Sequence, residues 1–199
     1  MNVDTRTGTT AVYHPGYSPG FPAYVQGIFN LANIGGIAVE GVASRLSESC
    51  AAMYPGAEGW KCAMGVYRMP HVQAPYMMVS SQADSYQLGH DIGHRPDRTD
   101  AELAYAATFA RRTREGGAGL LAPGSRGAAA GSTVYMMNCY SHATSGRAGF
   151  WDMDVRGWRI ADALAAFMGI PWGRVLTEPL PAGGLVDGGG VGFAGGVGC

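Results

Sequence analysis

The sequence has few charged residues and no run of charges of one sign. Its 199 residues include 14 Lys and Arg and 15 Asp and Glu, which gives a formal net charge of -1. A protein that binds nucleic acid or an anionic membrane surface through electrostatics normally shows a basic patch or tract. Because this chain has no such tract, we expect no nucleic-acid partner.

Long apolar runs are also missing. No stretch reaches the roughly 18–20 residues that a helix needs to cross a bilayer. The first residues contain no apolar h-region, so no signal peptide is visible in this sequence. We therefore expect no membrane span. The hydrophobic content of 47% is still sufficient for one domain with a buried core.

Cysteine is scarce as well, and four residues are too few for a disulfide-dense scaffold. Cys50 and Cys62 enclose a turn-rich loop that contains Pro-Gly and Gly-Trp pairs. Such a pair can form a disulfide across the loop, or it can remain two buried thiols in a reducing compartment. The number of cysteines does not decide between these alternatives.

Two strand-like stretches each lead into a residue whose side chain can take part in catalysis. Residues 76–79 are apolar, follow a proline, and lead through polar residues to Asp84. Residues 133–139 lead directly into His142. Short apolar runs of this kind are typical of buried strands, and open α/β sheets place their chemistry at the carboxyl ends of the strands. The pattern predicts an α/β fold in which Asp84 and His142 supply two of the three members of a hydrolase triad.

Both residues also have a purely structural interpretation. The segment Asp-Ser-Tyr-Gln at 84–87 fits a capping box in which Asp84 caps a helix and Gln87 occupies the N3 position. His142 alone fits an ordinary packed histidine.

The third member of the triad is not evident. Residues 16–20 (Gly-Tyr-Ser-Pro-Gly) formally match the nucleophile elbow G-x-S-x-G, which makes Ser18 a candidate nucleophile. However, the residue after the serine must donate its backbone N–H to the oxyanion hole, and Pro19 has none. The stretch is more typical of a loop.

Residues 89–94 hold His90, Asp91 and His94, but their spacing matches no standard zinc pattern. Their glycines favour a mobile loop, and we expect no metal ligands in the chain.

The remaining elements define the expected domain organisation. We predict a helix over 101–115 capped by Asp100, a small-residue loop over 116–132, and a helix over 160–168. Residues 1–22 are rich in turn formers and are expected to form an irregular N-terminal segment. The structured domain is expected to span 23–178, and the glycine-rich residues 179–199 are expected to form a disordered tail.

Several stretches, taken in order, resemble the pectin acetylesterase/Notum family of α/β-hydrolase-fold carboxylesterases. They are the cysteine pair with Gly-Trp-Lys-Cys at 59–62, the Met-Pro-His segment leading into the first strand, the Asp-Ser-Tyr-Gln-Leu run at 84–88, the Cys-Tyr-Ser-His run at 139–142, and the glycine turn at 154–157 before the helix at 160–167. The resemblance covers roughly residues 23–170.

The resemblance implies the C-terminal half of an α/β-hydrolase fold, with Asp84 as triad acid, His142 as triad base and a Cys50–Cys62 disulfide. It implies a secreted enzyme that deacylates a polysaccharide or another ester and needs no cofactor. The family's Gly-x-Ser-Ala-Gly-Gly elbow is missing before Cys50. We therefore expect the chain to be a fragment that is inactive unless an upstream serine is supplied. The alternative is a non-catalytic relative that acts as a glycan- or protein-binding module.

Overall fold

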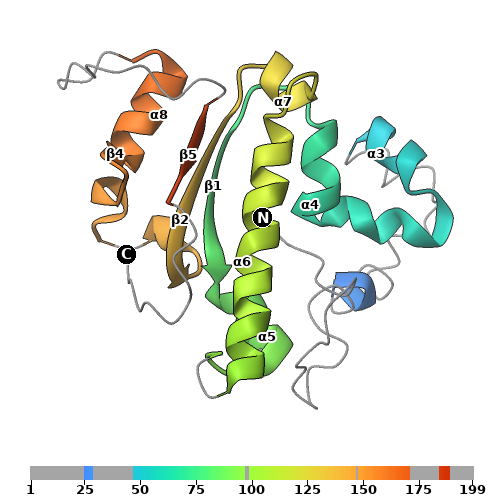
Figure 1. The fold of residues 1–199 in the computed structure, drawn as a ribbon. Coiled ribbons are helices and arrows are strands. Elements are labelled where there is room, and N and C mark those ends of the chain that lie inside the picture. The colour runs from blue at the N-terminus through green and yellow to red at the C-terminus, as the bar shows by residue number, and fades with distance from the viewer. Residues whose placement is uncertain (1–24, 29–46, 97–98, 147, 171–183, 189–199) are drawn as a thin grey trace.

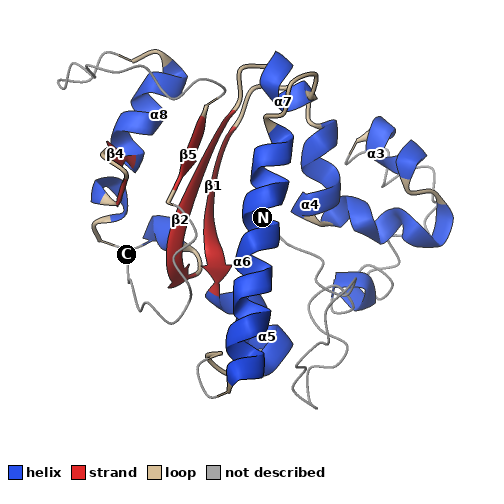
Figure 2. Cartoon of the chain, viewed as in Figure 1, coloured by secondary structure: helices blue, strands red, loops and turns tan. Residues whose placement is uncertain are grey.

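The computed structural model describes residues 25–28, 47–96, 99–146, 148–170 and 184–188. Its centre is a three-stranded sheet of strands β1 (Met77–Asp84), β2 (Thr133–Ser141) and β5 (Leu185–Asp187), in the order β1-β2-β5. Both strand pairings are parallel. Helices flank this sheet (Figures 1 and 2). The chain therefore has the mixed α/β architecture with a parallel sheet that the sequence predicts.

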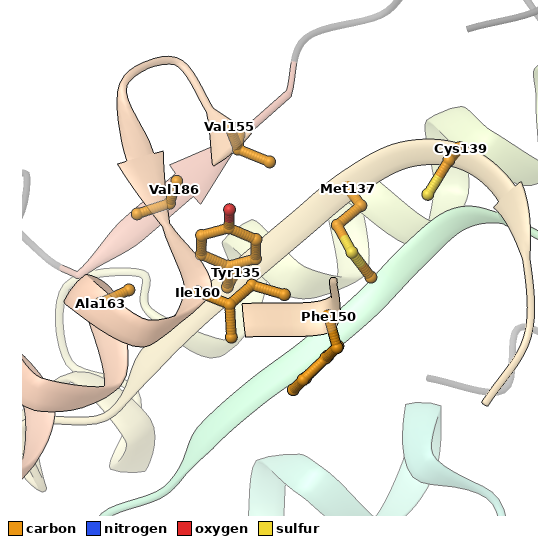
Figure 3. Close-up of a cluster of buried hydrophobic side chains, with 8 residues drawn as sticks. All are labelled: Tyr135, Met137, Cys139, Phe150, Val155, Ile160, Ala163 and Val186. Atoms are coloured by element: carbon orange, nitrogen blue, oxygen red, sulfur yellow. The ribbon is translucent and has the colours of Figure 1, made fainter. Parts of the chain in front are cut away.

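Strand β2 is covered on both faces. Val134 and Met136 are fully buried in a cluster with Leu120, the last residue of helix α6 (Asp100–Leu120). Their neighbours Tyr135 and Met137 turn the other way and pack with helix α8 (Ile160–Met168), as Figure 3 shows. Side chains of a strand alternate between faces, and a parallel strand covered on both faces is apolar throughout. This double burial explains why residues 133–139 show no polar alternation.

Smaller elements connect these parts. On the side of α6 lie α3, η1, α4, η2 and α7, and the segment after β2 contains η3, η4 and the antiparallel pair β3–β4. Their bounds are α3 Glu48–Met53, η1 Gly56–Ala63, α4 Gly65–Arg68, η2 Met69–His71, α5 Ser85–Ile92, α7 Arg126–Ala129, η3 Thr144–Gly146, η4 Phe150–Asp152, β3 Asp154–Val155 and β4 Trp158–Arg159.

Helix α6 is longer than the sequence predicts. Its N-cap is Thr99, whose side chain accepts the backbone N–H of Glu102, so Asp100 is the first helical residue rather than the cap. The helix continues to Leu120, and the prediction of a loop over 116–132 is wrong there and at α7. A Cβ atom at Gly117 would lie 2.7 Å from the Met136 sulfur. The glycine therefore allows close packing of helix against sheet, which offsets its low helix propensity.

The prediction of a disordered tail over 179–199 is wrong for residues 185–187, which form β5. Val186 is 2% exposed and belongs to the cluster on the α8 side of the sheet. A three-residue strand is too short to be detected among glycines, and its pairing with β2 is what orders it. The predicted irregular segment at 1–22 lies outside the described residues.

Gly127 offers a direct test of packing beside the sheet. A Cβ atom there would lie 2.3 Å from the backbone oxygen of Leu120, whereas a Cβ atom at Gly119 would meet nothing within 4 Å. We expect Gly127→Ala to lower the free energy of unfolding by about 1–3 kcal/mol through overpacking. The matched control Gly119→Ala should be neutral or stabilising by about 0.4–1 kcal/mol. Urea denaturation measures the free energy of unfolding of both variants. Equal values would contradict the close packing of Gly127 against the Leu120 backbone.

Candidate active site

Asp84 is fixed by two elements at once. It is the last residue of β1 and the N-cap of α5, and its Oδ1 atom accepts the backbone N–H of Gln87 at 2.9 Å. This is the cap-to-N3 bond that the capping-box pattern predicts. One carboxylate oxygen is therefore held by the helix, and the other remains for a different partner.

That partner is His142, the residue immediately after β2. Its Nδ1 atom lies 2.8 Å from Asp84 Oδ2. The Asp84 side chain is 15% exposed and the His142 side chain 48% exposed. The carboxylate is thus largely covered while the imidazole opens to solvent. The structure brings together the two residues that sequence order selects, and Asp84 takes part in both the helix cap and the pair.

An irregularity in β2 sets the alignment of the pair. Ser81 lies opposite Met137, but Ala83 lies opposite Tyr140, so β2 advances one residue more than β1. The extra residue is the mark of a β-bulge, which re-aims the side chains beyond it. The Ser81 hydroxyl donates to the Cys139 carbonyl at this point. As a result Asp84 lies opposite Ser141, and His142 follows directly.

The backbone after the pair is bent sharply. Ala143 has a φ of 48°, in the left-handed region that residues other than glycine seldom adopt. Such conformations cost of order 1–3 kcal/mol and persist where the surroundings fix them. The turn carries the chain away from the sheet directly after His142.

Tyr86 stacks on the His142 ring. The two ring centroids are 4.9 Å apart with an interplanar angle of 26°. Tyr86 also contacts His90: the two ring centroids are 4.0 Å apart, and His90 Nδ1 lies 2.8 Å from the Tyr86 carbonyl oxygen. Tyr86 therefore restricts the plane of the imidazole, and 38% of the tyrosine remains exposed beside it. This role of Tyr86 is not among the sequence-based predictions; its one signal in the sequence is an aromatic residue two positions after the predicted acid.

No described serine forms a hydrogen bond with the His142 ring. Ser141 is adjacent in sequence but is 1% exposed, and its Oγ lies 3.3 Å from the Cys139 sulfur. Ser18 lies outside the described residues. Within the described part of the chain, the Asp84–His142 pair therefore has no serine hydroxyl at its imidazole.

The histidines at 89–94 do not converge. Helix α5 runs through this stretch to Ile92, so the predicted loop is wrong. The buried Asp91 carboxylate accepts the Tyr105 hydroxyl at 2.8 Å, while His94 lies 3.5 Å from Glu102. Among the described residues, no group of three or more His, Cys, Asp or Glu side chains could hold a metal ion.

Cys50 and Cys62 form a disulfide, and both are fully buried. The bridge joins α3 to η1, which confirms the first of the two alternatives for this pair.

A shallow apolar pocket of about 390 Å³ lies along α8 and contains no titratable group; its lining residues are Trp151, Ala161, Leu164, Ala165, Met168 and Ile170.

Comparisons with protein-family models and with curated protein sequences find no match to this chain. Within the described residues, no helix combines the length and the apolar character needed to span a bilayer.

Proposed function

We propose that the chain carries the acid and base of a carboxylic ester hydrolase, with Asp84 as the acid and His142 as the general base. The observation that supports this most strongly is the 2.8 Å hydrogen bond between Asp84 Oδ2 and His142 Nδ1 at the carboxyl ends of two parallel strands. A carboxylate on one imidazole nitrogen is the arrangement that prepares the other nitrogen to accept a proton.

The chemistry follows from the direction of this bond. A carboxylate can only accept, so His142 donates from Nδ1, and its Nε2 carries the lone pair. A serine hydroxyl at Nε2 would transfer its proton there as its oxygen attacks an ester carbonyl. Asp84 would then stabilise the imidazolium, and His142 would return the proton to the leaving alcohol. The half-exposed ring is accessible to both the hydroxyl and the substrate.

The proposal extends the sequence resemblance to pectin acetylesterase and Notum enzymes. Under it the parallel sheet is part of an α/β-hydrolase fold, and acylated polysaccharides are the substrate class. The Cys50–Cys62 disulfide agrees with secretion, because such bonds persist in oxidising compartments. Tyr86 is 38% exposed beside His142, and an aromatic side chain at this position is suited to contact with a sugar.

The nucleophile would come from outside the described residues. In the described sheet β1 has β2 as its one strand neighbour, so the edge of the sheet next to Asp84 is where a further strand of such a fold would add. Ser18 and a serine elbow upstream of this sequence are the two candidate sources.

A second candidate function is binding without catalysis. It is favoured by the absence of a described serine at His142 and by the apolar pocket along α8, which has no catalytic group. In that case an acylated glycan would bind beside Tyr86 and remain unchanged.

The experiment that separates these functions combines mass spectrometry with an ester assay. The intact mass and the N-terminal peptide of the protein from its source are determined, and hydrolysis of a small acetate ester is measured on the same preparation and on the 199-residue chain with and without Ser18→Ala. We expect a mass above 20.7 kDa, an upstream Gly-x-Ser-x-Gly peptide, and hydrolysis. A protein of 20.7 kDa that binds acetylated pectin but does not hydrolyse the ester would overturn the hydrolase proposal in favour of binding.

A further inference from the structure

Three polar side chains from separate elements form one hydrogen-bonded cluster. They are Ser49 of α3, His71 of η2 and Arg126 of α7. The Ser49 oxygen lies 3.0 Å from His71 Nδ1 and 3.4 Å from Arg126 Nη1. A fourth group, the Ser47 hydroxyl, lies 3.2 Å from the Ser49 oxygen. The serine hydroxyl is thus the centre of the cluster.

The hydrogen-bonding capacity of these groups limits the direction of each bond. Arg126 can only donate, so the Ser49 oxygen accepts from it. Ser47 accepts the backbone N–H of Cys50, and its own proton is free to be donated to Ser49. In that arrangement the hydroxyl proton of Ser49 points to His71 Nδ1, and the histidine is neutral with its proton on Nε2.

The surroundings of His71 favour that neutral form. Burial lowers its pKa below the usual 6.5, and the positive charge of Arg126 lowers it further. The other charged residues on the neighbouring elements are Arg68 on α4 and Glu48 on α3. A lowered pKa keeps the lone pair of the imidazole available to lower pH than in an ordinary histidine. Serine, base and cation are the components of an activated nucleophile.

This cluster is separate from the Asp84–His142 pair. His71 precedes β1, whereas Asp84 is the last residue of that eight-residue strand. A strand of this length spans on the order of 20 Å. Ser49 consequently cannot serve as the nucleophile for His142.

We propose that Ser49 and His71 are a second nucleophile–base pair, which acts on esters carrying a negative charge that Arg126 can bind. The Ser49 oxygen forms a bond to the carbonyl carbon as its proton passes to His71 Nδ1. The bond from that carbon to the leaving alcohol then breaks, and His71 returns the proton to the alcohol. Water, deprotonated in turn by His71, releases the acyl group as a carboxylic acid and restores Ser49.

The test is covalent labelling of the intact, oxidised 199-residue chain with a fluorophosphonate. The Ser49 oxygen would bond to phosphorus, fluoride would leave, and the serine proton would pass to His71. Peptide mapping is expected to place the label on Ser49. Label found elsewhere, or no label after prolonged incubation, overturns the proposal without need of any variant. Mapping also distinguishes this site from a serine activated by His142.

Variants then test the roles of the three residues. Ser49→Ala should abolish labelling, while the control Ser145→Ala, an exposed serine, should leave it unchanged. His71→Gln retains a hydrogen-bond acceptor but no base and should slow labelling at least about tenfold. Arg126→Gln should slow it and move its pH dependence upward, because it removes a charge that lowers the His71 pKa. Unchanged rates in both of the latter variants, with unchanged melting temperatures, would contradict the assignment.

Discussion

His142→Ala is expected to lower ester hydrolysis by about 10³-fold or more, measured on the form of the protein that contains the nucleophile. The substitution removes the general base that is proposed to act with Asp84. The histidine side chain is half exposed, so its loss should change the free energy of unfolding by less than about 1 kcal/mol. A large loss of rate without loss of stability would assign His142 to chemistry rather than to packing.

Asp84→Asn separates the two roles of the aspartate. Asparagine is as good an N-cap as aspartate, so the bond to the Gln87 N–H and the stability of α5 should survive. The amide cannot stabilise an imidazolium, and we expect hydrolysis to fall by about 10²–10⁴-fold. The matched control is Asp100→Asn, because Asp100 lies in the first turn of α6. Equal activity in the two variants would show that Asp84 acts as a helix cap alone.

A large effect on stability is expected from the disulfide. The double variant Cys50→Ser, Cys62→Ser should lower the free energy of unfolding by about 3 kcal/mol, since the bridge closes a loop with a sequence separation of 12. Both cysteines are fully buried, so the new hydroxyls add a desolvation cost. Thermal denaturation of the oxidised unsubstituted chain and of the double variant measures the effect, because reduction would also open the disulfide bond of Cys139.

The same variant tests the position of Ser49. Residues 49 and 50 are adjacent on α3, so loss of the bridge releases the helix that carries the proposed nucleophile. Fluorophosphonate labelling should therefore slow in the double variant. A melting temperature unchanged in this variant would contradict a stabilising role for the bridge.

Both central strands could be predicted because local sequence determines them. Residues 76–79 and 134–137 are apolar runs, and the second is buried on both faces of the sheet. Strand β1, however, continues past the first run through polar, buried residues to Asp84. The pairing of Asp84 with His142 followed from strand order alone. The alignment of the two side chains could not be predicted. It depends on the β-bulge in β2, which lies between the partners of Ser81 and Ala83 and has no signature in the local sequence.

Features that depend on tertiary packing were not predictable. The glycines at 116–119 suggest a loop, yet Gly117 lies where a helix closely approaches Met136, so the helix continues. Strand β5 is ordered by its pairing with β2. His71 and Arg126 lie 22 and 77 positions from Ser49, and no motif in the sequence connects such distant residues.

The measurement that tests the acid–base pair most directly is the tautomer of His142, read from its ¹⁵N chemical shifts in the intact chain at alkaline pH. The account predicts a proton on Nδ1, donated to Asp84, and a bare lone pair on Nε2. Asp84→Ala should remove this preference, while His90, whose Nδ1 faces a carbonyl oxygen, provides an internal reference. A His142 ring protonated on Nε2 in the unsubstituted chain would mean that Asp84 does not orient it, and the proposed hydrolytic pair would be wrong.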